Sequence, residues 1–122
     1  MRPQPGQPLL GVKRVGGVAV VRFLRPAIRD VGLVEAVAGE LSRVLAREVP
    51  PRLVLDFGGV TYLSSAMLGA VLTANHKARA AGGRLALCAL APEVAALFGV
   101  TRLDREFDIY PTEQEALRSF ED

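Results

Sequence analysis

The stretch from Leu53 to Leu72, LVLDFGGVTYLSSAMLGAVL, constrains the fold of this 122-residue chain more than any other segment. It begins with a short apolar run, Leu53–Leu55, that is typical of a buried strand, and it ends in a helix expected from Ser65 to about Ala81. A compact loop with two glycines joins them. A buried strand followed at once by a helix favours an α/β arrangement, in which helices cover a sheet.

Two adjacent serines, Ser64 and Ser65, lie where this helix begins. A serine at the N-cap accepts a hydrogen bond from a free backbone N–H of the first turn, and Ser64 suits that structural role. The second hydroxyl is then spare, and it lies near the positive end of the helix dipole, where a phosphate is tolerated. The sequence therefore indicates a hydroxyl that can be modified without unfolding the protein.

The N-terminal part of the chain predicts a hairpin followed by a helix. Extended runs at 9–15 and 18–24 flank a Gly-Gly pair, which favours a tight turn because the turn positions need positive φ. Asp30 is a candidate N-cap, and apolar residues then recur at the helical spacing. The Pro-Pro pair at 50–51 ends this helix, since the residue before a proline is pushed out of the helical region.

The C-terminal part continues the alternation of strands and helices. After the Gly-Gly pair that ends the long helix we expect a strand at 84–90, a helix at 93–98, an edge strand at 105–110 and a helix at 113–120. Thr112 and Glu115 form a capping box for the last helix. These elements predict one α/β domain over 9–122, with a mixed sheet of four to five strands and about four helices, after a flexible tail at 1–8.

Composition excludes several classes of function. Half of the residues are hydrophobic and 23% are charged, which is typical of a globular chain. The single cysteine, Cys88, excludes an internal disulfide, and no apolar run reaches the length of a membrane span, so we expect a cytoplasmic protein without membrane insertion. The net charge is only +2 and basic residues do not alternate with aromatic ones, so nucleic-acid binding is not expected.

Three polar side chains suggest chemistry, and each has a structural alternative. Asp56 follows a strand as in phospho-accepting receivers, but the N-terminal strands lack the acids that would hold a metal, and hydrogen bonding to loop N–H groups is favoured. His76 has no metal-ligand neighbours at suitable spacing, and Cys88 lies in an apolar strand that favours an inert thiol. No G-x-S-x-G motif supports a serine triad. We predict no catalytic, cofactor or metal site.

The organising stretch resembles the signature of STAS-domain anti-sigma factor antagonists. Members of that family have a strand, a loop ending in Asp-Ser-Ser/Thr-Gly-Leu-Gly, and then a helix. The matching residues here are Val60, Thr61, Tyr62, Leu63, Ser65, Leu68 and Gly69. The similarity continues through AAGGRLALCALAPEVAALFGVTRLDREFDIYPTEQEAL, so it covers nearly the whole chain and implies a single STAS-like α/β domain.

The resemblance also implies a function and a site. Ser65 falls on the serine that an anti-sigma factor of the serine-kinase type phosphorylates in that family, and a serine phosphatase would reverse the modification. The unmodified protein would bind the anti-sigma factor and so release a sigma factor, acting as a monomer or weak dimer. The implied partner-binding residues are Thr61, Tyr62, Ser64, Met67 and Gly69.

The helix pattern adds two expectations about these residues. We expect Leu68 and Val71, with Leu72, to face the core, and Met67 to project to another side. Gly69 disfavours a helix by about 1 kcal/mol relative to alanine. Either it allows the backbone of a partner to approach, or it allows close packing of the helix on the sheet.

Three departures from the family pattern motivate alternatives. Ser64 replaces the usual Asp, Ala66 the second hydroxyl residue, and Met67 the usual Gly. A second hypothesis is therefore a constitutive docking module that is not phosphorylated. A third is a peripheral STAS subunit of a membrane transport complex, which would need no spanning segment of its own.

Overall fold

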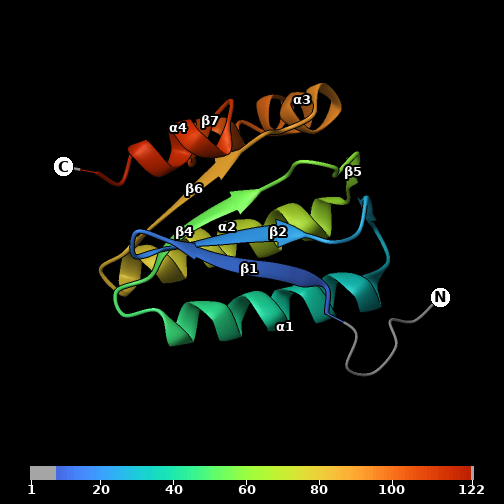
Figure 1. The fold of residues 1–122 in the computed structure, drawn as a ribbon. Coiled ribbons are helices and arrows are strands. Elements are labelled where there is room, and N and C mark those ends of the chain that lie inside the picture. Colours follow the sequence, from blue (N-terminus) through green and yellow to red (C-terminus); the bar gives the residue numbers. More distant parts are fainter. Residues whose placement is uncertain (1–7, 122) are drawn as a thin grey trace.

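The structure is a computed structural model that describes residues 8–121, and it confirms the predicted α/β fold (Figure 1). The expected flexible tail at 1–8 lies outside the described residues except for Pro8. In chain order the elements are β1 (Leu10–Val15), β2 (Val18–Phe23), β3 (Ala27–Ile28), α1 (Val31–Arg47), β4 (Arg52–Asp56), β5 (Tyr62–Leu63), α2 (Ser65–Ala80), β6 (Arg84–Cys88), α3 (Pro92–Val100), the 3₁₀ helix η1 (Leu103–Arg105), β7 (Asp108–Tyr110) and α4 (Glu113–Arg118).

The main sheet is mixed, as predicted, and has the strand order β1-β2-β4-β6-β7. Only β1 runs antiparallel to its neighbour; the pairs β2–β4, β4–β6 and β6–β7 are parallel. A second, two-stranded sheet joins β3 to β5 in parallel. The carboxyl ends of β2, β4 and β6 therefore meet at one edge of the main sheet, and Figure 1 places β5 and the start of α2 at that same end.

The predicted hairpin is confirmed. Val15 pairs with Val18, so the turn consists of Gly16 and Gly17, whose φ angles are +56° and +83°. L-residues with side chains rarely adopt such angles, which explains the glycine pair. The hairpin places β1 at the outer edge of the sheet.

Two apolar layers lie on opposite faces of the main sheet. Side chains of one parity along the strands, including Val21, Leu55 and Leu87, pack with α1 and α2 into the larger core. Their neighbours in sequence, including Val54 and Cys88, form a smaller cluster that Ala116 of α4 covers. The parallel strands are therefore buried on both faces, as their continuous apolar runs require.

The predicted helix caps are also present. Asp30 accepts a hydrogen bond from the Leu33 N–H at 3.1 Å and begins α1, and Thr112 accepts one from the Glu115 N–H at 3.1 Å and begins α4. At the end of α2 the Gly83 N–H donates to the Ala78 carbonyl at 2.8 Å. Local capping chemistry thus defines the ends of three helices.

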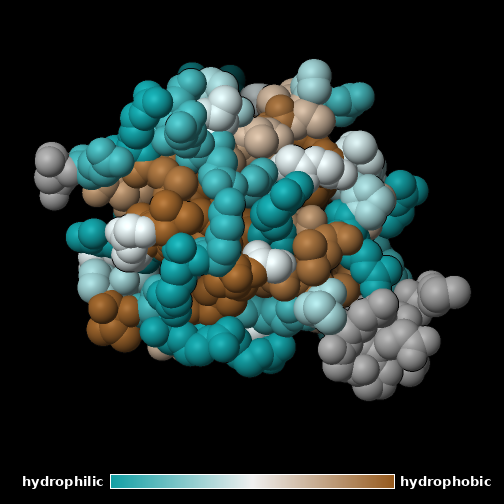
Figure 2. Space-filling model, viewed as in Figure 1, coloured by the Kyte–Doolittle hydropathy of each residue, from teal (hydrophilic) through white to brown (hydrophobic). Residues whose placement is uncertain are grey.

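The exposed surface carries apolar and polar groups side by side. Figure 2 shows apolar side chains on the face that presents the β1–β2 hairpin, interrupted by hydrophilic ones. Lys13 Nζ of β1 and Glu113 Oε2 of α4 form an ion pair at 3.0 Å. Among residues 8–121, none of the helices combines the length and the apolar character needed to cross a membrane.

Candidate functional site

The two serines at the start of α2 have different roles. Ser64 is the N-cap, with φ −78° and ψ 162°, and its Oγ accepts a hydrogen bond from the Met67 N–H at 3.2 Å. Ser65 is the first residue of the helix and is exposed. Within residues 8–121 its hydroxyl has no hydrogen-bond partner. The cap interpretation of Ser64 is therefore confirmed, and the Ser65 hydroxyl is left for solvent.

The loop before the serines is tied down by its backbone. β5 pairs with β3 in the register Ala27–Tyr62 and Ile28–Leu63, and the Ser64 N–H extends this ladder by donating to the Ile28 carbonyl at 3.0 Å. The Thr61 N–H donates to the Pro26 carbonyl at 2.7 Å. The sequence did not predict this ladder, although it holds the approach to Ser65 in one position.

Asp56 shapes the other side of the same loop. Its Oδ1 accepts a hydrogen bond from the Gly58 N–H at 2.8 Å, and the residue is only 7% exposed. Gly59 follows with φ +89°, and the Val60 N–H closes the turn on the Phe57 carbonyl at 2.9 Å. The favoured interpretation of Asp56, a carboxylate bonded to loop N–H groups, is confirmed.

Three of the predicted contact residues lie at the surface beside Ser65. Tyr62 is 46% exposed, and the guanidinium carbon of Arg29 lies 4.6 Å from the centre of its ring. Thr61 is exposed, and its hydroxyl donates a hydrogen bond to the Pro26 carbonyl oxygen. A side chain placed on the exposed Gly69 would meet no heavy atom within 4 Å, so the alternative of close packing against the sheet is wrong.

The expectation that Met67 projects away from the core is also wrong. Its side chain is 0% exposed and belongs to the larger core cluster. Met67, Val71, Ala74 and Ala78 recur at three- and four-residue spacing, so they form the buried face of α2 together with Leu68. Met67 supports the site from inside and is not available for contact with a partner.

The remaining candidate residues are not brought together for catalysis. His76 is exposed on α2, about 16 Å along the helix axis from Ser65. Its Nε2 lies 3.9 Å from Glu106 Oε1. Cys88 is buried, and burial, followed by the charge of Asp56, raises its pKa to about 12. Its thiol is therefore protonated at neutral pH, as expected for an inert cysteine. Residues 8–121 contain no His, Cys, Asp and Glu cluster suited to a metal ion.

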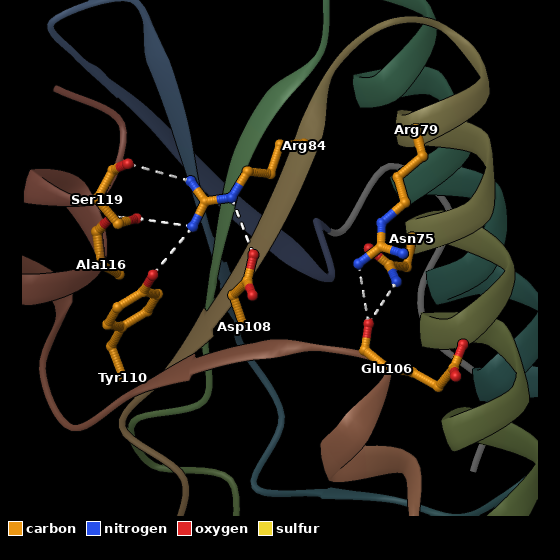
Figure 3. A network of polar contacts seen from close by, with 8 residues as sticks. All are labelled: Asn75, Arg79, Arg84, Glu106, Asp108, Tyr110, Ala116 and Ser119. Atoms are coloured by element: carbon orange, nitrogen blue, oxygen red, sulfur yellow. Dashed lines mark hydrogen bonds and ion pairs between the residues drawn. The ribbon is translucent and has the colours of Figure 1, made fainter. Parts of the chain in front are cut away.

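The densest polar network lies at the opposite end of α2 and serves the fold (Figure 3). The half-buried Arg84 donates to Asp108 Oδ2 at 2.9 Å, to the Tyr110 hydroxyl at 3.0 Å and to Ser119 Oγ at 3.0 Å. Its guanidinium carbon also lies 4.4 Å from the ring centre of Phe120. These contacts attach the C-terminal segment to β6. The Asp108 carboxylate also pairs with the charge of Arg84.

Comparisons with known proteins identify the family and support the fold. The family model described as the STAS domain matches residues 12–116. A Bordetella bronchiseptica protein, BtrV, provisionally named an anti-sigma factor antagonist, is 34% identical over 86 residues, which is 68% of this chain and 74% of BtrV. An anti-sigma factor antagonist from Mycobacterium paratuberculosis superposes with a TM-score of 0.81 at 28% identity, covering 93% of each chain.

A second similar structure is that of the Bacillus cell fate determinant SpoIIAA in its phosphorylated form. It superposes with a TM-score of 0.66 at 22% identity, over 90% of this chain and 97% of SpoIIAA. At that identity the likeness concerns the fold alone.

Proposed function

The chain belongs to the STAS domain family, and from that premise we propose that it is an anti-sigma factor antagonist whose docking is switched by phosphorylation of Ser65. The role is one of binding and not of catalysis. Its partner would be an anti-sigma factor of the serine-kinase type, and a serine phosphatase would restore the unmodified form. A partner that controls a sigma factor implies a cytoplasmic protein, because bacterial transcription takes place in the cytoplasm.

One observation carries the proposal: Ser64 performs the structural task at the start of α2, and the neighbouring hydroxyl of Ser65 is exposed. A phosphate on Ser65 leaves the cap bond to the Met67 N–H in place. It also lies at the positive end of the helix dipole, where a negative charge is tolerated. Modification therefore changes the docking surface while the fold persists.

The energetic effect of the phosphate is large enough for a switch. Phosphoserine adds about −1.5 to −2 charges at neutral pH. In an interface that charge must lose its water or meet the charges of the partner, and a cost of about 3 kcal/mol weakens binding by roughly a hundredfold. The contact surface would comprise the exposed residues around Ser65, namely Thr61, Tyr62 and Gly69, with Ser64 beside them.

The test compares three proteins against a serine-kinase anti-sigma factor from the same genome: wild type, Ser65→Ala and Ser65→Asp. We expect tight binding of wild type and Ser65→Ala, and a loss of about a hundredfold for Ser65→Asp. Equal affinities of the alanine and aspartate variants would refute the switch. Incubation with the kinase and ATP, followed by intact-mass measurement, should add one phosphate to wild type and none to Ser65→Ala.

The same experiments separate the alternatives. Binding without any transfer of phosphate favours the constitutive docking module that the departures at Ser64, Ala66 and Met67 suggest. Recovery with membrane components, together with no affinity for the anti-sigma factor, favours a peripheral subunit of a transport complex. A monomer or weak dimer is expected throughout, and sedimentation of the free protein checks it.

A further inference from the structure

The loop and helix around Ser65 carry no formal charge. Residues 57–76 contain no Asp, Glu, Lys or Arg, and their histidine is counted as neutral. The first charged residue beyond this stretch is Lys77, on the fourth turn of α2. Any fixed charge beside Ser65 must therefore come from another segment of the chain.

Arg22 of β2 reaches the start of the loop, where it donates to the Gly58 carbonyl at 3.4 Å, and the segment Pro26–Arg29 runs beside the end of the loop in the β3–β5 ladder. The Ser64 N–H donates to the carbonyl of Ile28, so the next residue, Arg29, lies beside the serine pair. Arg29 is exposed, and its guanidinium stacks over the Tyr62 ring at 4.6 Å. The aromatic ring holds the cation at the surface by the attraction between a positive charge and the ring face.

Two carboxylates in the neighbouring segments accept backbone hydrogen bonds. Asp30, the next residue, uses its carboxylate to accept the Leu33 N–H at the start of α1. Asp56 is almost fully buried and accepts the Gly58 N–H. No salt bridge joins either carboxylate to Arg29 within residues 8–121. The guanidinium of Arg29 is therefore not ion-paired within the described residues, while the neighbouring Asp30 keeps its own negative charge.

Exposed apolar side chains accompany this charge. Leu24 is 49% exposed just before the Pro26–Arg29 segment, and Val31 is 66% exposed just after it. Together with Tyr62 they place aliphatic and aromatic side chains in and next to the segments that carry Arg29 and Ser65. Arginine and aromatic residues are enriched at the centres of protein interfaces, where they contribute most to affinity.

We propose that this surface binds an acidic face of the anti-sigma factor, with a carboxylate of the partner seated on Arg29 and apolar contacts to Tyr62. The inference rests on the proposed function and adds the chemistry of the partner. It also gives the switch a cause. A phosphate on Ser65 adds about −1.5 to −2 charges near Arg29, which offsets the attraction and repels the partner's carboxylate.

The test is the salt dependence of affinity for the anti-sigma factor, measured from about 50 to 500 mM NaCl, a range over which the Debye length falls severalfold. Arg29→Glu should weaken binding at least about tenfold at low salt. Arg47→Glu is the matched control, because it makes the same charge change about 25 Å away at the other end of α1. It should alter affinity by no more than about twofold. Tyr62→Phe should bind like wild type, since the ring is kept.

The salt dependence of the affinity of Ser65→Asp provides a second test. If the aspartate acts through charge, its loss of affinity should shrink severalfold at high salt. Thermal denaturation of each variant checks that its fold is intact.

Each outcome decides one of the two claims. If wild type binds and Ser65→Asp does not, but Arg29→Glu binds as wild type does, the acidic-partner inference is overturned and the switch remains. Equal losses for Arg29→Glu and Arg47→Glu also overturn it, because net charge alone would then explain the effect. If wild type itself fails to bind any serine-kinase anti-sigma factor of its genome, the proposed function fails and the inference fails with it.

Discussion

The two ends of α2 are built in opposite ways. At the end that carries Arg84, polar side chains bind one another, so little of their capacity remains for a partner (Figure 3). At the Ser65 end, about 24 Å away along the helix, backbone groups of β3 and β5 provide the hydrogen bonds, and the side chains of Thr61, Tyr62 and Ser65 face solvent. At the proposed docking surface the main chain thus supplies the order, and the side chains stay available for a partner.

Gly83 and Gly69 differ in the same way as the two ends of α2. A side chain on Gly83 would place its Cβ 1.8 Å from the Pro51 carbonyl oxygen, which already accepts the Arg84 N–H. A side chain on Gly69 would meet nothing within 4 Å. The fold therefore requires glycine at position 83. At position 69 the fold alone does not require it.

The largest effect is expected for Gly83→Ala. The new methyl group overlaps a backbone atom, so the junction between β4 and β6 must shift, at a cost of about 3 kcal/mol or more in the free energy of unfolding. Guanidinium denaturation of the variant and the wild type measures it. A loss below about 1 kcal/mol would show that the backbone around Pro51 and Gly83 can shift at little cost, and that glycine is not required there.

Arg84→Ala should come next. It removes hydrogen bonds to Asp108, Tyr110 and Ser119, and we expect a loss of about 2 kcal/mol. Arg79→Ala is the control, because Arg79 is exposed and makes one hydrogen bond, to the Glu106 carbonyl, and it should cost about 0.5 kcal/mol or less. Similar losses for the two variants would mean that the network contributes little to stability.

The two serines should separate by about 1 kcal/mol. Ser64→Ala removes the cap bond to the Met67 N–H and should lower the free energy of unfolding by about that amount. Ser65→Ala should leave it unchanged or raise it slightly, because alanine favours helices and the hydroxyl has no partner to lose within residues 8–121. Denaturation curves of both variants test this, and the reverse order would contradict the assignment of the cap.

Gly69→Ala should raise the stability of the protein, whereas Gly83→Ala, Arg84→Ala and Ser64→Ala should lower it. The site is open, so the gain in helix propensity of up to about 1 kcal/mol should appear as added stability. If the glycine serves docking, the same variant should bind the anti-sigma factor more weakly while being more stable. Greater stability with unchanged affinity would remove Gly69 from the docking surface.

Most of the fold was predictable because its signals are local. The glycine turn, the caps at Asp30, Ser64 and Thr112, and the apolar strands each act over a few neighbouring residues. The ladder between β3 and β5 was not predictable in this way. Each strand has two residues, too few for a periodic pattern, and the pairing joins segments 35 residues apart, Ala27 to Tyr62.

The candidate site was predicted in part. The cap at Ser64 and the exposure of Ser65 followed from helix-start chemistry. The direction of the Met67 side chain was not predicted, because α2 is apolar on more than one side. Its large hydrophobic residues Leu68 and Leu72 suggested a different buried face. Arg29 gave no signal of its own, since its partner Tyr62 reaches it only through the tertiary pairing of β3 with β5.

The ladder between β3 and β5 has a consequence for the kinetics of docking. A surface whose main chain is already ordered pays little conformational entropy when a partner arrives, so encounter can proceed as between two rigid bodies. Formation of the complex should then need no slow ordering step, whatever the state of Ser65. Modification would slow encounter through charge repulsion and would also shorten the lifetime of the complex.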